Sequence, residues 1–101
     1  MDKTAYVYIV GNDRPTLYIG VTTELSKRIW EHCHQTGASF THKYHLNKLL
    51  YFEAYPNIDS AIAREKQLKR WHREWKLNLI KSTNPTFEDL TLRLDPETSS
   101  G

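Results

Sequence analysis

The sequence predicts an α+β domain in which helices pack on a small three-stranded antiparallel sheet. Two short segments rich in Tyr, Val and Ile flank a cluster of turn-forming residues, and a third strand-like segment follows them. Apolar residues elsewhere recur at helical spacing. The 101 residues are enough for one hydrophobic core, so we expect a single domain over residues 1–94 and a disordered tail over residues 95–101.

The first two strands form a predicted β-hairpin. Residues 5–10 and 17–21 carry strand-forming side chains, and the turn-forming residues 11–15 lie between them. Tyr6 and Tyr8 share one face of the first strand, because side chains alternate along a strand. Aromatic residues are common in strands, so this pair alone indicates no function.

The first helix is predicted over residues 24–35, because Leu25, Ile29 and Cys33 recur every four residues and so share one helix face. Residues 38–45 have no sustained period and are expected to form an ordered loop.

A third strand is predicted over residues 46–55, joining the hairpin. Its side chains should alternate between two faces. We expect Leu50, Phe52 and Ala54 on one face and Tyr51, Glu53 and Tyr55 on the other.

A second helix is predicted from Asp59, a good N-cap residue, to about His72. Its apolar stripe is formed by Ile58, Ala61, Ile62 and Leu68. Glu65 stands where this stripe requires an apolar residue. An ion pair with a neighbouring Arg or Lys, or a helix turned slightly outward, would explain it. The alternative is that Glu65 is a metal ligand.

A third helix is predicted over residues 73–82 from the apolar set Trp75, Leu79 and Ile80. Pro85 should follow its end, because proline cannot continue a helix. Three apolar residues beyond it can still dock on the domain: Leu90, Leu92 and Leu94.

Arg28 and His32 are four residues apart on the first helix, so they share a face at the edge of the apolar stripe. A guanidinium there can bind a phosphate through two parallel hydrogen bonds, and an imidazole can move a proton near neutral pH. Spacing alone favours an ordinary amphipathic boundary, from which a long arginine side chain reaches solvent.

The net charge of +2 is unevenly distributed. Residues 1–59 contain six basic and six acidic residues, whereas residues 64–81 contain seven basic and two acidic ones. Trp71, His72 and Trp75 are interleaved with these basic residues, as is typical of surfaces that bind a polyanion with stackable bases. A solvated basic helix face explains the lysines and arginines alone about as well.

Several protein classes are disfavoured. The apolar runs are far shorter than the roughly 20 residues needed to cross a bilayer, so no membrane association is expected. The N-terminus lacks a signal-peptide pattern and Cys33 is the single cysteine, which favours a reducing cytoplasm. The five histidines and Cys33 show no paired ligand spacing, so structural zinc is not expected.

Five segments together resemble the GIY-YIG nuclease superfamily, in particular its small stand-alone bacterial members similar to the nuclease domain of excinuclease C. They are Tyr6-Val7-Tyr8-Ile9, Leu17-Tyr18-Ile19-Gly20-Val21-Thr22, Phe40-Thr41-His42-Lys43-Tyr44, Ala63-Arg64-Glu65-Lys66-Gln67-Leu68-Lys69 and Asn84-Pro85. The resemblance covers about residues 4–90. Tyr6-Val7-Tyr8 stands where the family has Gly-Ile-Tyr, a substitution common to this subgroup that keeps the tyrosine.

The resemblance implies an endonuclease that cleaves nucleic-acid phosphodiester bonds with one divalent metal ion, Mg²⁺ or Mn²⁺, and no nucleotide cofactor. It favours DNA over RNA, selectivity for structure or strand, and a role in DNA repair or processing. Glu65 would hold the metal and Arg28 would clamp the scissile phosphate. Either Tyr8 or Tyr18 would be the general base, and His32 would relay the proton.

The expected nucleic-acid contacts are Lys43, Tyr44, Lys69, Arg70, Arg73 and Lys76. Asn78 is a loose match to a late asparagine of the family. The oligomeric state is not predicted.

Two other functions remain open. In the first, the protein binds nucleic acid without turnover: residues 64–81 track phosphates, and Trp71, Trp75 or Tyr44 stacks on bases. In the second, the protein has a structural or protein-interaction role. The combination of a tyrosine pair with a glutamate at the rim of the core favours the nuclease, because binding alone requires neither.

Overall fold

The computed structural model describes residues 3–12, 16–34 and 48–91, and for residues 32–34 it describes the backbone alone. In chain order the elements are β1 (Ala5–Gly11), β2 (Leu17–Thr22), α1 (Leu25–His34), β3 (Lys48–Tyr55), α3 (Ile58–Arg70) and α4 (Arg73–Thr83). The predicted α+β class and order of elements are confirmed. The expected loop at 38–45 and the tail at 95–101 lie outside the described residues.

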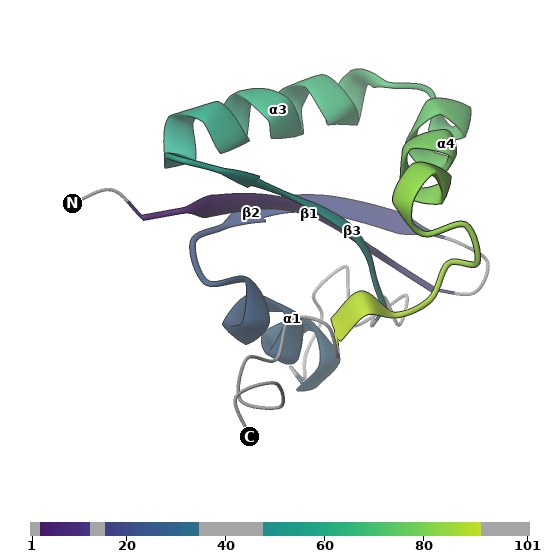
Figure 1. Cartoon of the computed structure of the whole chain (residues 1–101), viewed down its shortest axis with the longest axis horizontal. Helices are drawn as coiled ribbons and strands as arrows, with labels where there is room; N and C mark the ends of the chain where they lie inside the picture. The colour runs from purple at the N-terminus through teal and green to yellow at the C-terminus, as the bar shows by residue number, and fades with distance from the viewer. Residues whose placement is uncertain (1–2, 13–15, 35–47, 92–101) are drawn as a thin grey trace.

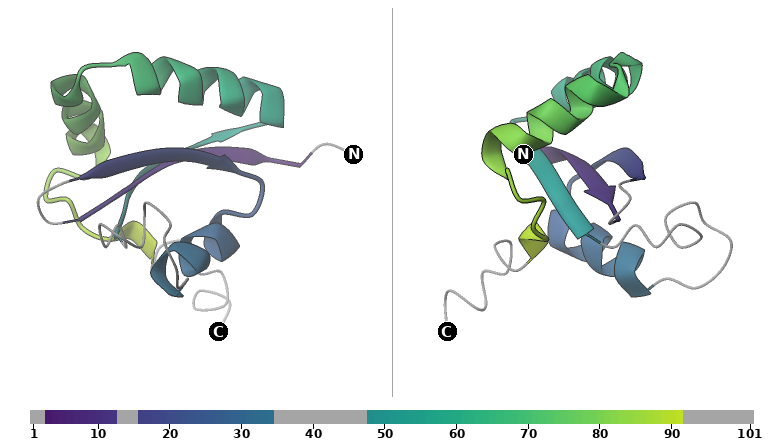
Figure 2. Two further views of the ribbon diagram at one scale, coloured as in Figure 1. Left: turned by 180° about the vertical axis from the view of Figure 1, so that it is seen from behind. Right: turned by 90° about the vertical axis from the view of Figure 1, so that its right-hand side faces the viewer.

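β1 is the central strand of the sheet, whose order is β2-β1-β3 and whose two pairings are antiparallel. α3 lies over one face of the sheet, α4 follows it at one end, and α1 lies against the other face (Figure 1). Figure 2 shows the same layers from behind and from the side. β2 is therefore an edge strand between two helical layers.

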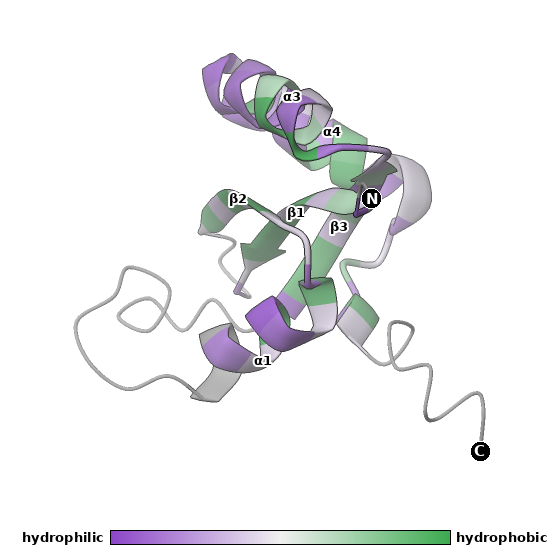
Figure 3. Ribbon diagram, turned by 90° about the vertical axis from the view of Figure 1, so that its left-hand side faces the viewer, coloured by the Kyte–Doolittle hydropathy of each residue, from purple (hydrophilic) through white to green (hydrophobic). Residues whose placement is uncertain are grey.

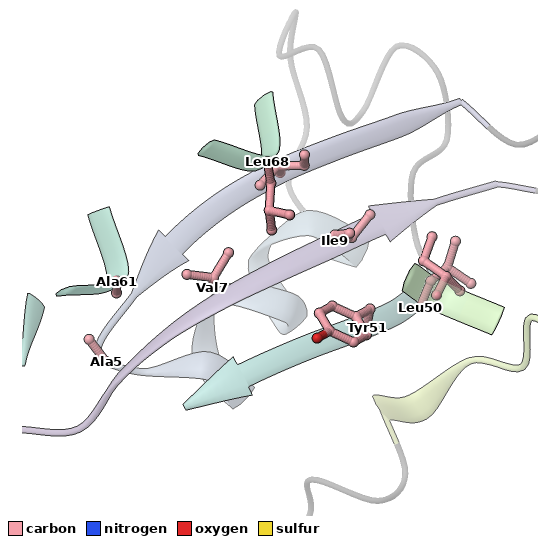
Figure 4. Packing of buried hydrophobic residues seen from close by; sticks show 9 residues of the cluster. Ala5, Val7, Ile9, Leu50, Tyr51, Ala61 and Leu68 are labelled. Atoms are coloured by element: carbon pink, nitrogen blue, oxygen red, sulfur yellow. The ribbon is translucent and has the colours of Figure 1, made fainter. Parts of the chain in front are cut away.

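The apolar core has two parts, one on each face of the sheet, because alternate residues of β1 point to opposite faces. The part towards α3 is formed by Ala5, Val7, Ile9, Ile19, Leu50, Tyr51, Ala61, Leu68 and Ile80 (Figure 4). The part towards α1 is formed by Tyr8, Val10, Leu25, Ile29, Leu49 and Leu90.

The strands are largely hydrophobic, whereas α1 and α3 carry many hydrophilic residues (Figure 3). Both helices therefore present one apolar side to the sheet and a polar side to solvent. In the part of the chain that the structure describes, no helix is long and apolar enough to cross a membrane.

A β-bulge in β3 changes the predicted face of Leu50. Ile9 pairs with Tyr51, but the next residue, Val10, pairs with Leu49. Leu50 is the extra residue, and it packs with Tyr51 towards α3 instead of with Phe52 towards α1. The prediction for Leu50 was wrong because strict alternation fails where one strand carries an inserted residue.

The N-cap of α3 is Asn57, and the prediction of Asp59 was wrong. Asn57 has extended backbone angles, and its side chain accepts a hydrogen bond of 2.8 Å from the Ser60 backbone N–H. Asp59 lies inside the first turn, where a carboxylate favours the positive end of the helix dipole. Asn57 and Asp59 both suit a helix start, and the local backbone decides between them.

The two predicted helical stripes are only partly buried. Ala61, Leu68 and Ile80 are fully buried, whereas Ile58 is 40% exposed. The apolar set that predicted α4 is divided: Ile80 is buried, whereas Trp75 is 53% exposed. α4 starts at the end of the sheet face, so only part of its apolar side meets the core.

Asn84 closes the described part of the fold. It is 4% exposed, and its side-chain amide donates hydrogen bonds to the carbonyls of Leu50, at 3.1 Å, and Glu88, at 2.8 Å. Its side-chain oxygen accepts one from the Glu88 backbone N–H at 2.9 Å. Asn84 thus joins the end of α4 to the bulge in β3 and directs the chain towards Leu90. Leu92 and Leu94 lie outside the described residues.

Candidate active site

Tyr8 of β1 and Arg28 of α1 are in direct contact. Arg28 Nε donates a hydrogen bond to the Tyr8 hydroxyl at 3.3 Å, and Arg28 Nη1 lies 3.2 Å from Glu31 Oε1. Tyr8 is 1% exposed, whereas the Arg28 side chain is 39% exposed. The guanidinium therefore connects a buried phenol to the surface. With five N–H donors it can bind a phosphate oxygen in addition to these partners.

The environment of Tyr8 favours its protonated form. Burial raises the pKa of Tyr8 above that of an ordinary tyrosine, and the hydrogen bond and charge of Arg28 lower the pKa by less. The charges of Tyr18 and Glu65 raise the Tyr8 pKa further. Arg28 thus acts in the direction that favours phenolate, but burial outweighs it.

Tyr18 lies on the edge strand β2, with its ring centroid 6.5 Å from that of Tyr8 and the two planes at 45°. It is partly buried and lines an open groove of about 340 Å³ with Leu17, Ile19, Lys69 and Lys76. The groove places Tyr18 beside two cationic side chains from α3 and α4. Of the two tyrosines, Tyr18 is the more accessible.

Gly20 makes room for the Tyr8 side chain. Tyr8 and Gly20 are paired across β1 and β2, and the Tyr8 ring extends over Gly20. A Cβ at Gly20 would collide with the Tyr8 hydroxyl and would lie 2.6 Å from Cζ. A larger residue at position 20 would therefore displace the phenol from Arg28.

Glu65 lies on α3, with its side chain 19% exposed, and Oε2 is 3.3 Å from Lys69 Nζ. The predicted ion pair therefore exists, four residues along the same helix. Lys69 is 53% exposed, and pairs of this kind stabilise a helix by only about 0.3–0.5 kcal/mol. The ion pair thus gives little compensation for keeping a carboxylate mostly out of water. Glu65 is also close enough to Tyr8 for its charge to act on the phenol.

The residues present fit a single divalent cation held largely by water and substrate. Within the ranges the structure describes, no three or more His, Cys, Asp or Glu residues group around a possible metal site. Mg²⁺ keeps several waters and is commonly held by one or two carboxylates together with substrate phosphates. Glu65 provides one such carboxylate at the rim of the core.

The other predicted site residues differ in how the structure places them. Lys69 and Lys76 line the groove beside Tyr18, whereas Arg70 and Arg73 are exposed around the junction of α3 and α4. Asn78 is exposed on α4. Lys43 and Tyr44 lie outside the described residues, as does the side chain of His32.

The sequence reasoning missed a polar network next to the candidate site. Glu53 of β3 accepts hydrogen bonds from Arg64 Nε at 3.0 Å, from Arg64 Nη2 at 3.1 Å and from Tyr55 at 2.6 Å, and it also accepts one from Tyr51. Burial alone would raise the pKa of Glu53, but these hydrogen bonds lower it below the ordinary value. The predicted alternation of β3, which placed Glu53 between two tyrosines, was the available signal.

Arg64 immediately precedes Glu65 on α3 and is held in place from two sides. It binds Glu53 through two nitrogen atoms, and its guanidinium carbon lies 5.1 Å from the centre of the Trp71 ring. This clamp fixes the rotation of α3 over the sheet and so contributes to the position of Glu65.

The sequence matches the family model for the GIY-YIG catalytic domain over residues 4–78. A UPF0213 protein of Clostridium perfringens is 42% identical over 77 residues, covering 76% of this chain and 83% of its own. A UPF0213 protein of Haloquadratum walsbyi is 35% identical over 79 residues, covering 78% and 89%.

The solution NMR structure of the UPF0213 protein BH0048 from Bacillus halodurans has the same fold. Its TM-score is 0.55 at 28% identity, and the match covers 87% of this chain and 94% of that one. The matched residues 4–78 include the Tyr8–Arg28 pair, Tyr18 and Glu65. This chain belongs to the GIY-YIG family, a superfamily of nucleases.

Proposed function

We propose that this protein is a metal-dependent endonuclease that hydrolyses phosphodiester bonds in nucleic acid, with DNA favoured over RNA, in DNA repair or processing. The observation that carries the proposal is the hydrogen bond from Arg28 to the buried Tyr8, beside a second tyrosine and within the electrostatic range of Glu65. Ordinary packing does not require a buried phenol bonded to an arginine, with a mostly buried carboxylate whose charge reaches that phenol.

Each side chain has a proposed role. Arg28 binds the scissile phosphate and stabilises the charge that develops on it, as preorganised donors do in phosphoryl chemistry. Tyr18 lines the open groove beside Lys69 and Lys76, so it is the tyrosine better placed to act, as its phenolate, as the base that takes a proton from an attacking water. Tyr8 stays protonated and holds Arg28 in position.

A divalent cation held by Glu65 would supply Lewis-acid stabilisation of charge on the phosphate. Lys69 shares the same carboxylate, and with a cation on Glu65 its side chain, which is 53% exposed, would be available to a backbone phosphate.

The proposal is tested by incubating the purified protein with labelled single-stranded, duplex and branched DNA and RNA, in Mg²⁺, Mn²⁺ or EDTA. We expect cleavage that requires the metal and is lost in Glu65→Gln. Glu74→Gln is the matched control, because Glu74 is an exposed carboxylate on the neighbouring helix. Full cleavage by Glu65→Gln would contradict the metal-ligand role, and cleavage in EDTA would contradict metal dependence.

A nucleic-acid-binding module without turnover is the second candidate. The ion pair between Glu65 and Lys69 favours it, because the carboxylate already has a cationic partner without any metal. In that case the protein would bind nucleic acid in a separate affinity measurement, and the same assay would show no cleavage in Mg²⁺ or Mn²⁺.

A further inference from the structure

We propose that the exposed face of Trp75 is a stacking platform for an unpaired base of the nucleic-acid strand whose backbone enters the groove beside Tyr18. This proposal rests on the proposed function, because it names the form of substrate: a strand that is single-stranded next to the site. In a fully paired duplex the bases stack on one another, so no base is available to stack on Trp75.

Trp75 is one of three large hydrophobic side chains that stand exposed among the described residues, and it is 53% exposed. It is not loosely held. Trp71 packs against it with ring centroids 5.9 Å apart and planes at 83°, and His72 does so at 5.1 Å and 88°. These two perpendicular contacts fix the orientation of the indole while half of it stays in water. A rigid aromatic surface of this kind binds at low entropic cost.

Trp71 cannot serve in the same way. It is partly buried against the α3 side of the core, and the Arg64 guanidinium lies over its ring at 5.1 Å. Trp71 therefore supports the junction of α3 and α4, and Trp75 is the ring of the pair that remains available to a ligand.

The surroundings of Trp75 match a polyanion. Arg70 and Arg73 are exposed on either side of the junction, and Lys76 follows Trp75 directly. Lys76 also lines the groove with Lys69 and Tyr18. A strand held at Tyr18 therefore meets Lys69 and Lys76, and an unpaired base beyond Lys76 would meet Trp75, the preceding residue of α4. Phosphate contacts and base stacking in alternation are the usual means of binding single strands.

A protein partner fits this surface less well. Residues 64–81 carry seven basic residues against two acidic ones, and such a charge favours a polyanion. An unpaired base also explains why an aromatic ring, and not an aliphatic one, is held rigidly at the edge of a basic surface.

The test compares Trp75→Leu with Trp75→Phe in the full chain, in EDTA so that no strand is cut. Leucine keeps an apolar side chain but offers no aromatic face, whereas phenylalanine keeps the face. The probes are one labelled oligonucleotide as a single strand, as a blunt duplex and as a duplex with an unpaired tail, in DNA and RNA versions. Fluorescence anisotropy measures affinity, and circular dichroism melting establishes that both variants fold.

We expect Trp75→Leu to lose about 5- to 100-fold in affinity for single strands and tailed duplexes, as when one base loses its aromatic partner, and to bind blunt duplex as the wild type does. Trp75→Phe should retain most of the affinity. Trp30→Leu is the matched control, because Trp30 is 61% exposed on α1. Equal losses for blunt duplex and single strand, equal losses in Trp75→Leu and Trp75→Phe, or no loss in Trp75→Leu would overturn the proposal.

The outcome is separable from that of the proposed function. Stacking on Trp75 without any metal-dependent cleavage would support this inference and contradict the nuclease. Metal-dependent cleavage together with an affinity that does not depend on Trp75 would support the nuclease and contradict this inference.

Discussion

The phenol ring of Tyr8 occupies the space in which a side chain on Gly20 would stand. A Cβ at Gly20 would lie 2.6 Å from Cζ and 3.0 Å from Cε1 of that ring. The ring is buried and its hydroxyl is bonded to Arg28, so it has little freedom to move aside. The position of the phenol that holds Arg28 therefore depends on the absence of one methyl group on the neighbouring strand.

Gly20→Ala should lower the free energy of unfolding by roughly 1–3 kcal/mol, the usual cost of overpacking a core. Urea unfolding followed by circular dichroism measures this cost. The same change made in a Tyr8→Leu background should cost much less, because the ring atoms that collide with the new methyl are then missing. An equal cost in both backgrounds would show that the collision with Tyr8 is not the cause.

The stability of the protein should fall as the pH rises above about 10, the ordinary pKa of tyrosine. Unfolded tyrosine then loses its proton, whereas Tyr8 in the folded state, with its raised pKa, keeps it until a higher pH. Tyr8→Phe should therefore show a shallower fall in the free energy of unfolding over this alkaline range. Tyr51 and Tyr55 also have raised pKa values, so part of the fall should remain. An unchanged slope in Tyr8→Phe would mean that Tyr8 is not shielded as described.

Arg28→Ala should raise the pKa of Tyr8 further, because Arg28 is the group that lowers it. It should also reduce cleavage by about 10²–10³-fold, the loss typical of one preorganised donor. Tyrosinate absorbance measures the first effect and the rate of strand cleavage the second. Lys27→Ala is the control, since Lys27 is exposed and adjacent on the same helix. Equal rates in both variants would remove Arg28 from the site.

Arg64→Gln should destabilise the fold by about 2–3 kcal/mol, because it leaves the carboxylate of Glu53 mostly buried without its cationic partner. The pKa of Glu53 is lowered in the folded state, so the stability that the pair provides is present above pH of about 4.5 and is lost as the pH falls through the lower folded pKa. Urea unfolding at neutral and acidic pH measures both effects. A difference between wild type and variant that persists in strong acid would contradict this origin.

Lys76→Ala should weaken nucleic-acid binding and lower the salt dependence by about one phosphate contact, or roughly 0.7–0.9 in the slope of log K against log salt. Lys81→Ala, on the exposed last turn of the same helix, is the control. Affinities measured over a range of salt concentrations give both slopes. Identical slopes in the two variants would place the strand outside the groove.

The strands and helices could be predicted because each carries a clear period. Alternate side chains of β1 enter the two parts of the core, one on each face of the sheet. Leu25 and Ile29 of α1 are buried, as their spacing predicts. Leu50 could not be placed in this way, because the bulge in β3 arises from its pairing with β1. The alternation pattern of a single strand carries no information on its register with a neighbouring strand, so it cannot predict a bulge.

In the candidate site, too, some features could be predicted from the sequence of one element and others depend on how elements pack together. Glu65 stood out in the sequence because it interrupts an apolar stripe, and the structure places it at the rim of the core with its side chain 19% exposed. The protonation of Tyr8 could not be predicted, because it depends on how completely the sheet and α1 bury the phenol. The exposure of Trp75 depends in the same way on where α4 leaves the sheet.

The hydrogen bonds of Asn84 to Leu50 and Glu88 help to define the smallest piece of this chain that can fold independently. The family match ends at residue 78, but Ile80, Asn84 and Leu90 lie beyond it and are buried. A fragment that ended at residue 78 would leave the carbonyl of Leu50 without its amide partner and both parts of the core open at one end. The segment that matches the family model is therefore shorter than the folding unit, and excision, fusion or grafting of this domain has to carry the chain through Thr91.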